Sequence, residues 1–140
     1  MTRAMRIFLD ANILFSAAKT DGAIRSLVAR LLVARHECWV DAYVIEEARR
    51  NLIAKAAGRV PALDELLSRV SVSATTPAPG RTETYGLPAK DRVVLAAAVA
   101  LKCDALLTGD RTHFGRFYGR SLAGVRIHSP RSLYEEVFSS

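Results

Sequence analysis

The sequence predicts an α/β domain built around a parallel sheet. Short apolar runs that are typical of buried strands alternate with longer segments in which apolar residues recur every three or four positions. Strands that alternate with amphipathic helices form βαβ units, and the strands of such units are parallel. The chain has 140 residues, of which 50% are hydrophobic, and no composition shift marks a boundary. We therefore expect residues 1–140 to form a single domain with one core.

Residue patterns indicate where each strand and helix of the first half begins and ends. Strand 6–9 ends in a short turn that holds Asn12, and Asp21-Gly22 opens a helix with the amphipathic period. After a second strand, Asp41 is a favoured N-cap for a helix that Gly58 ends. The predicted elements are, in order, strand 6–9, helix 22–35, strand 38–40, helix 42–57, helix 61–68, strand 70–74, helix 93–102, strand 105–108, strand 125–128 and a helix from Pro130.

Similar patterns indicate where the strands and helices of the second half begin and end. Pro61 suits the first turn of a helix, and residues 70–74 alternate apolar and polar side chains like an edge strand. Residues 75–88 are rich in Thr, Pro and Gly, which predicts a long loop of the kind that is often functional. Asp91 opens the next helix, and the last helix begins at Pro130.

Four acidic residues are the candidates for a functional site. Asp10 and Asp110 each close an apolar run that predicts a strand, and each precedes an expected helix start. The carboxyl ends of parallel strands face one crevice, where ligands bind, and Glu47 and Asp91 lie at helix positions that could face the same crevice. Clustered carboxylates repel one another unless a cation neutralises them. Oxygen ligands suit Mg²⁺ or Mn²⁺.

Each acid also has a simpler interpretation. Asp10, Asp91 and Asp110 could be N-caps, a role that is compatible with binding an ion. Glu47 lies beside the buried stripe of its helix and is assigned to the site. Its neighbour Glu46 is assigned to a surface pair with Arg50, four residues later.

Two groups of residues are candidates for supporting roles. Asn12 follows Asp10 by two residues and Thr108 precedes Asp110 by two, so either could orient a carboxylate or merely complete a local turn. After Asp110, basic and aromatic residues interleave. Arginines pair with phosphate while aromatic rings stack on bases, or the rings simply fill the core. We expect Phe114 and Phe117 to lie inside, and the arginines to lie outside as candidate RNA contacts: Arg111, Arg116 and Arg120.

Charge and composition indicate the kind of partner and the cellular location of the protein. The formal net charge is +6, so an acidic site on a basic body suits nucleic acid, although the charge could serve solubility alone. Cys38 and Cys103 lack a metal-binding spacing and are expected to be buried thiols. The three histidines, His36, His113 and His128, also lack metal-ligand spacing. No signal peptide or membrane-spanning stretch is visible, so a cytoplasmic location without membrane contact is expected.

The chain resembles the PIN domain nucleases, and especially the VapC-like toxin ribonucleases of bacterial toxin–antitoxin pairs. The resemblance extends over most of the chain and lies in four segments that occur in the family's order. They are FLDANIL at 8–14, IEEARRNL at 45–52, KDRVVLAAA at 90–98 and ALLTGD at 105–110. The departures are the long loop 75–88 and Ala48, where a larger apolar residue is usual.

The resemblance implies a three-layer α/β/α sandwich with a central parallel sheet and a ribonuclease site that depends on Mg²⁺ or Mn²⁺. It also implies RNA as substrate, with an antitoxin protein and a second copy of the chain as further partners. The family's acids correspond to Asp10, Asp91 and Asp110 as ligands of the ion, with Glu47 binding a second ion or a water.

Two other functions fit the same scaffold. A phosphatase of the haloacid-dehalogenase kind would use Asp10 as nucleophile, but that class needs a second Asp two residues later, where this chain has Asn12, and a lysine that is not well placed here. A non-catalytic domain that binds RNA or protein would not need the acids. Metal-dependent cleavage of RNA, as against mere retention of RNA, separates the last alternative from a nuclease.

Overall fold

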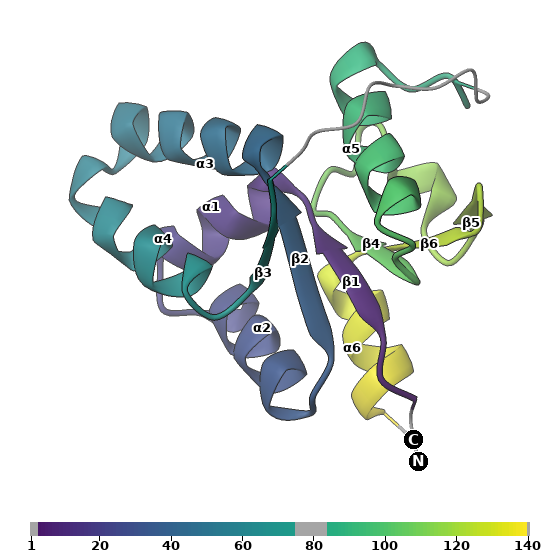
Figure 1. The fold of residues 1–140 in the computed structure, drawn as a ribbon, viewed down its shortest axis with the longest axis horizontal. Coiled ribbons are helices and arrows are strands. Elements are labelled where there is room, and N and C mark those ends of the chain that lie inside the picture. The colour runs from purple at the N-terminus through teal and green to yellow at the C-terminus, as the bar shows by residue number, and fades with distance from the viewer. Residues whose placement is uncertain (1–2, 75–83, 140) are drawn as a thin grey trace.

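The computed structural model describes residues 3–74 and 84–139, and within them the chain forms six strands and six α-helices (Figure 1). The strands are β1 (Arg6–Leu9), β2 (Glu37–Asp41), β3 (Ser71–Ser73), β4 (Ala105–Leu107), β5 (Ser121–Leu122) and β6 (Val125–His128). The helices are α1 (Ala11–Lys19), α2 (Ala23–Val33), α3 (Ala42–Lys55), α4 (Val60–Leu67), α5 (Ala89–Ala100) and α6 (Pro130–Phe138).

The order of the strands creates a crevice beside β1. Across the sheet the order is β3-β2-β1-β4-β6-β5, and neighbouring strands are parallel except for the antiparallel pair β5–β6. The chain builds outward from β1 through β2 and β3, and then adds β4 on the other side of β1. The order therefore reverses between β1 and β4, and this is the point where ligands bind in open α/β sheets.

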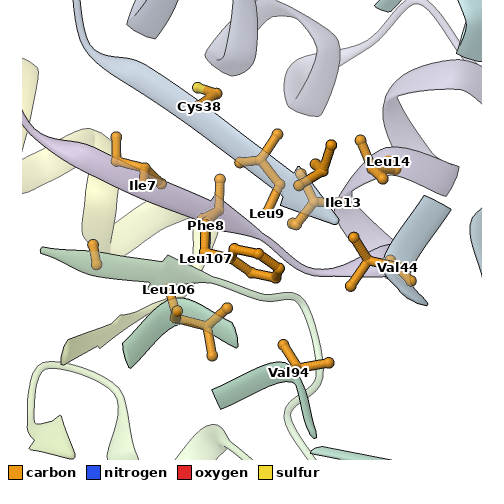
Figure 2. Packing of buried hydrophobic residues seen from close by; sticks show 14 of the residues in the cluster. Ile7, Phe8, Leu9, Ile13, Leu14, Cys38, Val44, Val94, Leu106 and Leu107 are labelled. Carbon is orange, nitrogen blue, oxygen red and sulfur yellow. The ribbon is translucent and has the colours of Figure 1, made fainter. Parts of the chain in front are cut away.

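Helices cover the sheet on both faces, so the predicted three-layer arrangement is confirmed. Helix α1 packs against α2, α3 and α4, whereas α5 packs against β4 and β6 and lies across the sheet from α1 (Figure 1). The central strands β1 and β4 are buried on both faces, which is why they appear in the sequence as continuous apolar runs. Figure 2 shows their side chains, with Phe8 and Leu106 fully buried among residues from both layers.

Helix α1 occupies the region that the predicted elements left as a short turn, although Asp10 was expected to precede a helix start. Asp10 is its N-cap and accepts a hydrogen bond from the backbone N–H of Ala11 (2.7 Å). Ile13 and Leu14 form part of its buried face. The prediction was wrong because Asn12 suggested a turn, whereas tertiary burial of the apolar face stabilises a nine-residue helix.

Two further expectations about helix starts need correction. Helix α5 begins at Ala89 after the N-cap Pro88, so Asp91 lies in the first turn and does not open the helix. No α-helix follows Asp110 directly in the described part of the chain; turns and a short 3-10 helix, Gly115–Phe117, stand there instead. Of the predicted loop 75–88, residues 75–83 lie outside the described residues.

The hairpin formed by β5 and β6 was not predicted. It turns at Ala123 and Gly124, whose φ angles are 50° and 85°, and positive φ at both positions is what a tight two-residue turn requires. Strand β5 has only two residues, too few for a visible alternation in the sequence.

The expectations about the two cysteines and about the edge strand agree with the structure. Cys38 and Cys103 are both buried and free. Strand β3 lies at the edge of the sheet, as the alternating pattern of residues 70–74 predicted. Among the described residues no helix has the length and apolar character needed to cross a membrane.

Candidate metal centre

A cleft of about 430 Å³ opens at the carboxyl ends of β1 and β4. Its walls come from α1, α3, the start of α5 and the turn that follows β4. We call it the acidic cleft, after the four predicted acids that line it: Asp10, Glu47, Asp91 and Asp110.

Asp10 is held rigidly at the floor of the acidic cleft. The residue is 4% exposed, and both of its carboxylate oxygens accept hydrogen bonds. Oδ1 accepts from the N–H of Ala11, and Oδ2 accepts from the Thr108 hydroxyl at 2.8 Å. Asp10 is therefore both the N-cap of α1 and a fixed carboxylate at the end of β1.

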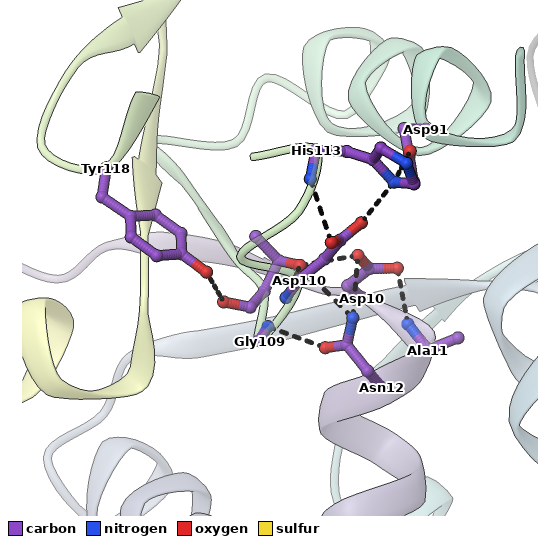
Figure 3. Close-up of polar contacts among 9 residues, drawn as sticks. Asp10, Ala11, Asn12, Asp91, Gly109, Asp110, His113 and Tyr118 are labelled. Carbon is purple, nitrogen blue, oxygen red and sulfur yellow. Dashed lines mark hydrogen bonds and ion pairs between the residues drawn. The ribbon is translucent and has the colours of Figure 1, made fainter. Parts of the chain in front are cut away.

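Hydrogen bonds of Asn12 and Thr108 connect the end of β1 with the end of β4. Figure 3 shows Asn12 beside Asp10 and Gly109. Thr108 is fully buried, and its hydroxyl also accepts a hydrogen bond from the N–H of Asp110 (3.1 Å). Asn12 Oδ1 accepts from the N–H of Gly109 at 2.8 Å, while its amide nitrogen lies 3.4 Å from Asp10 Oδ2. An amide engaged in this way is no acid or base, which counts against the phosphatase alternative.

Asp91 enters the cleft from the first turn of α5. Its side chain is 6% exposed, and Oδ2 makes no hydrogen bond with any described residue. His113 Nδ1 lies 3.0 Å from this oxygen, but the geometry is that of an ion pair and not of a hydrogen bond. A buried carboxylate oxygen without a hydrogen-bond donor is costly, and a positive charge beside it lowers that cost.

Asp110 and His113 belong to one tight turn after β4 (Figure 3). The N–H of His113 donates to Asp110 Oδ1 (3.1 Å), and the ring Nδ1 lies 2.9 Å from Asp110 Oδ2. The turn thus brings the imidazole over the carboxylate of the residue three positions earlier. His113 was missed in the sequence, although an acid and a histidine at i and i+3 form a known metal-binding pair on helices.

Burial governs the charge state of the innermost acids. Burial raises the pKa of Asp10 to about 6, although its hydrogen bonds lower it, and the charges of Asp91 and Glu47 add to the rise. Burial also raises the pKa of Asp91, and the negative charge of Asp110 contributes to that shift. Both carboxylates hold their protons more tightly than usual until a cation replaces them.

The structure distinguishes the two glutamates of α3. Glu47 lines the acidic cleft and is half-buried, whereas Glu46 is exposed. The expected ion pair between Glu46 and Arg50 is not formed among the described residues, where Arg49 pairs instead with Asp64 across to α4 (3.0 Å). An exposed pair of long side chains gains too little from contact to stay fixed, so Glu46 and Arg50 remain solvated.

The donor set of the cleft suits a divalent cation. Four carboxylates face two lysines, Lys55 and Lys90, so negative charge is in excess here although the chain as a whole carries +6. The buried Asp91 oxygen without a hydrogen bond is aimed into this cluster. Oxygen donors of this kind suit Mg²⁺ or Mn²⁺, and the residues present therefore fit such an ion.

The three candidate arginines lie outside the acidic cleft. Arg111, Arg116 and Arg120 are all exposed, as expected, and none of them lines the cleft. Arg116 is engaged within the protein, because its guanidinium donates to the carbonyl of Tyr85 at 2.7 Å and stacks 4.7 Å from the centre of the Phe117 ring.

The aromatic residues of this segment divide as expected. Phe114 is fully buried and Phe117 packs half-buried against the core. Tyr118 donates its hydroxyl to the carbonyl of Thr108 (3.2 Å), which fixes the segment beneath the cleft (Figure 3).

Comparisons with solved structures place this fold among those of protein complexes from bacteria. The structure of VapBC2 from Rickettsia felis bound to a DNA fragment from their promoter matches with a TM-score of 0.65 and 18% identity, covering 89% of this chain and 98% of that chain. VapBC-1 from nontypeable Haemophilus influenzae gives 0.62 and 15%, covering 91% and 99%. FitAcB from Neisseria gonorrhoeae gives 0.58 and 16%, covering 89% and 98%.

The comparison with family models identifies the chain directly. No match was found among curated proteins. The model described as PIN domain matches residues 6–112, a segment that begins with β1 and includes all four acids of the cleft. Because this match covers most of the chain, the protein belongs to the PIN domain family.

Proposed function

We propose that this protein is a ribonuclease that depends on a divalent metal ion and acts as the toxin of a toxin–antitoxin pair. The observation that carries the proposal is the convergence of four carboxylates in a PIN domain, one of which has a buried oxygen without a hydrogen bond. Mg²⁺ or Mn²⁺ would polarise the scissile phosphate and lower the pKa of an attacking water.

Each acid of the cleft has its own role in binding the ions. Asp10 is buried at the end of β1 with hydrogen bonds to both of its oxygens, and it would be the central ligand. Asp91 and Asp110 would complete the site from α5 and from the turn after β4. Glu47, half-buried on α3, would bind a second ion or a metal-bound water from its side of the cleft.

Cations and an aromatic ring at the rim of the cleft support RNA as the substrate. Phe15 lines the cleft, and the amino groups of Lys19 and Lys55 each lie 5.5 Å from the centre of its ring. Lys90 also lines the cleft, beside Asp91. A ring flanked by lysines can stack on an unpaired base while the lysines contact phosphates, and this combination is typical of single-strand binding.

The toxin part of the proposal comes from the neighbours in fold. The Rickettsia felis VapBC2 structure is bound to a DNA fragment from the promoter of its own components. If the present chain acts as those proteins do, it pairs with an antitoxin. Co-expression with the product of the adjacent gene, followed by co-purification, tests this partner separately from the activity.

Cleavage of single-stranded RNA in Mg²⁺ or Mn²⁺ tests the activity, and the two glutamates of α3 supply a matched pair of variants. Glu47→Gln should lower the rate by about 100-fold or more, because a metal site contributes several kcal/mol of charge stabilisation. Glu46→Gln should change it by less than about threefold, as exposed substitutions do.

Two results would contradict the proposal. The reverse ranking of the glutamate variants would move the site by one position along α3. Retention of RNA without cleavage in either metal would favour a non-catalytic RNA-binding domain.

A further inference from the structure

One ring nitrogen stands between two of the carboxylates of the acidic cleft. His113 Nδ1 lies 3.0 Å from Asp91 Oδ2 and 2.9 Å from Asp110 Oδ2 (Figure 3). These three atoms come from separate positions, one on α5 and two on the turn after β4. The imidazole is 34% exposed, so it also faces the open space of the cleft.

These distances match those between neighbouring ligands of one ion. Adjacent ligand atoms of an octahedral ion with bonds of about 2.0–2.1 Å are about 2.8–3.0 Å apart. The separation of Nδ1 from each carboxylate oxygen is close to this range. One ligand atom from each of the three residues lies within 4.8 Å of the others, so the group can converge on an ion with small movements.

The Asp91 oxygen gives a second and independent indication. It is buried and has no hydrogen-bond donor among the described residues. Of the two carboxylates, His113 Nδ1 has hydrogen-bond geometry only toward Asp110. The imidazole therefore makes no hydrogen bond with Asp91, and an ion between the three atoms would contact both carboxylates together.

We propose that His113 is a direct ligand of the metal ion, through Nδ1, together with Asp91 and Asp110. This inference rests on the proposed function, since it concerns the same site, and it adds a nitrogen donor to an otherwise oxygen-only set. The ring then carries its remaining proton on Nε2, the nitrogen that makes no contact with the two carboxylates.

A nitrogen ligand predicts which ion the site prefers. Carboxylates suit Mg²⁺, Ca²⁺ and Mn²⁺, whereas imidazole suits the transition metals. A mixed set of two carboxylates and one imidazole therefore favours Mn²⁺ over Mg²⁺. The cleft without His113 would lose most of that preference.

The competing interpretation is that His113 is protonated and serves as a fixed cation between the two acids. Both interpretations agree with the observed distances. They differ once an ion binds, because an imidazolium cannot coordinate it and would have to move away.

Pulsed electron paramagnetic resonance on the Mn²⁺-loaded protein separates the two. A coordinated imidazole gives a ¹⁴N modulation, and growth on ¹⁵N-labelled histidine should replace it with the ¹⁵N pattern without any change in sequence. Calorimetric titrations with Mn²⁺ and with Mg²⁺ complete the measurement. His113→Gln should abolish the imidazole signal and weaken Mn²⁺ binding by about 10-fold or more, at least the loss typical of residues that merely support a ligand, with a smaller loss for Mg²⁺.

His128→Gln is the matched control, because His128 lies away from the cleft and should be needed for neither the signal nor the ion preference. Binding of Mn²⁺ without an imidazole signal would overturn the role of His113 and leave the proposed nuclease site intact. An absence of binding for both ions would overturn the metal site itself. Thermal unfolding of each variant without metal shows whether the fold is retained.

Discussion

Two histidines of this protein are paired with carboxylates, and their surroundings differ. His113 lies between Asp91 and Asp110 at the mouth of the acidic cleft, where one carboxylate oxygen has no hydrogen bond. The His128 side chain is 4% exposed, and both of its nitrogens are engaged, Nδ1 with Ser132 Oγ at 2.8 Å and Nε2 with Glu136 Oε2 at 2.9 Å.

The His128 cluster is a structural network, whereas His113 belongs to a candidate binding site. Ser132 also belongs to the capping box of α6, so the His128 cluster ties β6 to α6 with each ring nitrogen satisfied. A fully satisfied network stabilises one arrangement and has nothing to offer a ligand. The acidic cleft, in contrast, keeps an unsatisfied carboxylate, and a bound cation would relieve that cost.

The largest expected effect comes from Asp10→Asn, which removes a buried charge at the floor of the cleft. Cleavage of RNA should fall by about 1000-fold or more, because several kcal/mol of charge stabilisation depend on this ligand. Without metal, the variant should nevertheless be more stable than the wild type. Burial holds the folded-state pKa near 6, so the ionised carboxylate costs the fold up to about 3 kcal/mol at neutral pH.

The sign of this effect appears in the pH dependence. A carboxyl with a raised folded-state pKa stabilises the fold below its ordinary pKa near 3.8, and this stability is lost as the pH rises to about 6. Denaturant unfolding without metal between these pH values should show the loss, and Asp10→Asn should remove it. Unchanged stability in the variant would mean that the cleft is not strained by charge.

The next effect tests the structural network. His128→Gln should destabilise the protein by about 1–3 kcal/mol, the cost of leaving buried hydrogen-bonding groups without partners. Burial lowers the pKa of His128, although Glu136 raises it in part. The neutral ring therefore contributes stability above its ordinary pKa, and this is lost as the pH falls below about 6.5, opposite in direction to Asp10.

Denaturant unfolding of the His128 variant across the same pH series checks this expectation. The acid-side loss of stability should be smaller than in the wild type, while binding of Mn²⁺ stays the same. A His128 variant that unfolds like the wild type but binds Mn²⁺ more weakly would mean that His128 belongs to the metal site and not to a structural network.

The smallest expected effect concerns the arginines outside the cleft. Replacing Arg111, Arg116 and Arg120 with Ala should weaken RNA binding and flatten its salt dependence, by about 0.7 in the log–log slope for each phosphate that the protein no longer neutralises. Arg116 already donates to Tyr85, so its share should be the least. Titrations of RNA across a salt series without metal measure the slope. An unchanged slope would mean that these arginines do not neutralise RNA phosphates, and the lysines at the rim of the cleft would then be the candidates.

The sequence predicted the central strands of the sheet and the four acids that line the cleft. Strands β1 and β4 are buried on both faces, and their apolar runs end close to the residues that enter the cleft. The sheet order then brings Asp10 and Asp110 to one edge, as the rule for parallel strands predicts. Glu47 could be preferred to Glu46 because a buried stripe fixes the rotation of α3.

The parts that the sequence did not reveal depend on tertiary contacts. Helix α1 is stabilised by packing against three other helices, which outweighs the turn signal of Asn12. His113 reaches the cleft because the chain turns sharply after Asp110, and the sequence favoured a helix there. The hydrogen bond missing at Asp91 could be found only once the positions of all nearby donors were known.

The hydrogen bond from Thr108 to Asp10 joins residues that are 98 positions apart, and this separation has a consequence for a growing polypeptide. Synthesis delivers β1 and its carboxylate long before β4 exists, and β4 is itself bordered by β6, which comes later still. The acidic cleft therefore cannot assemble until most of these residues have been made. The proposed nuclease would therefore be inactive toward the messenger that encodes it while its second half is still being added, because a chain interrupted before β4 lacks Thr108 and Asp110.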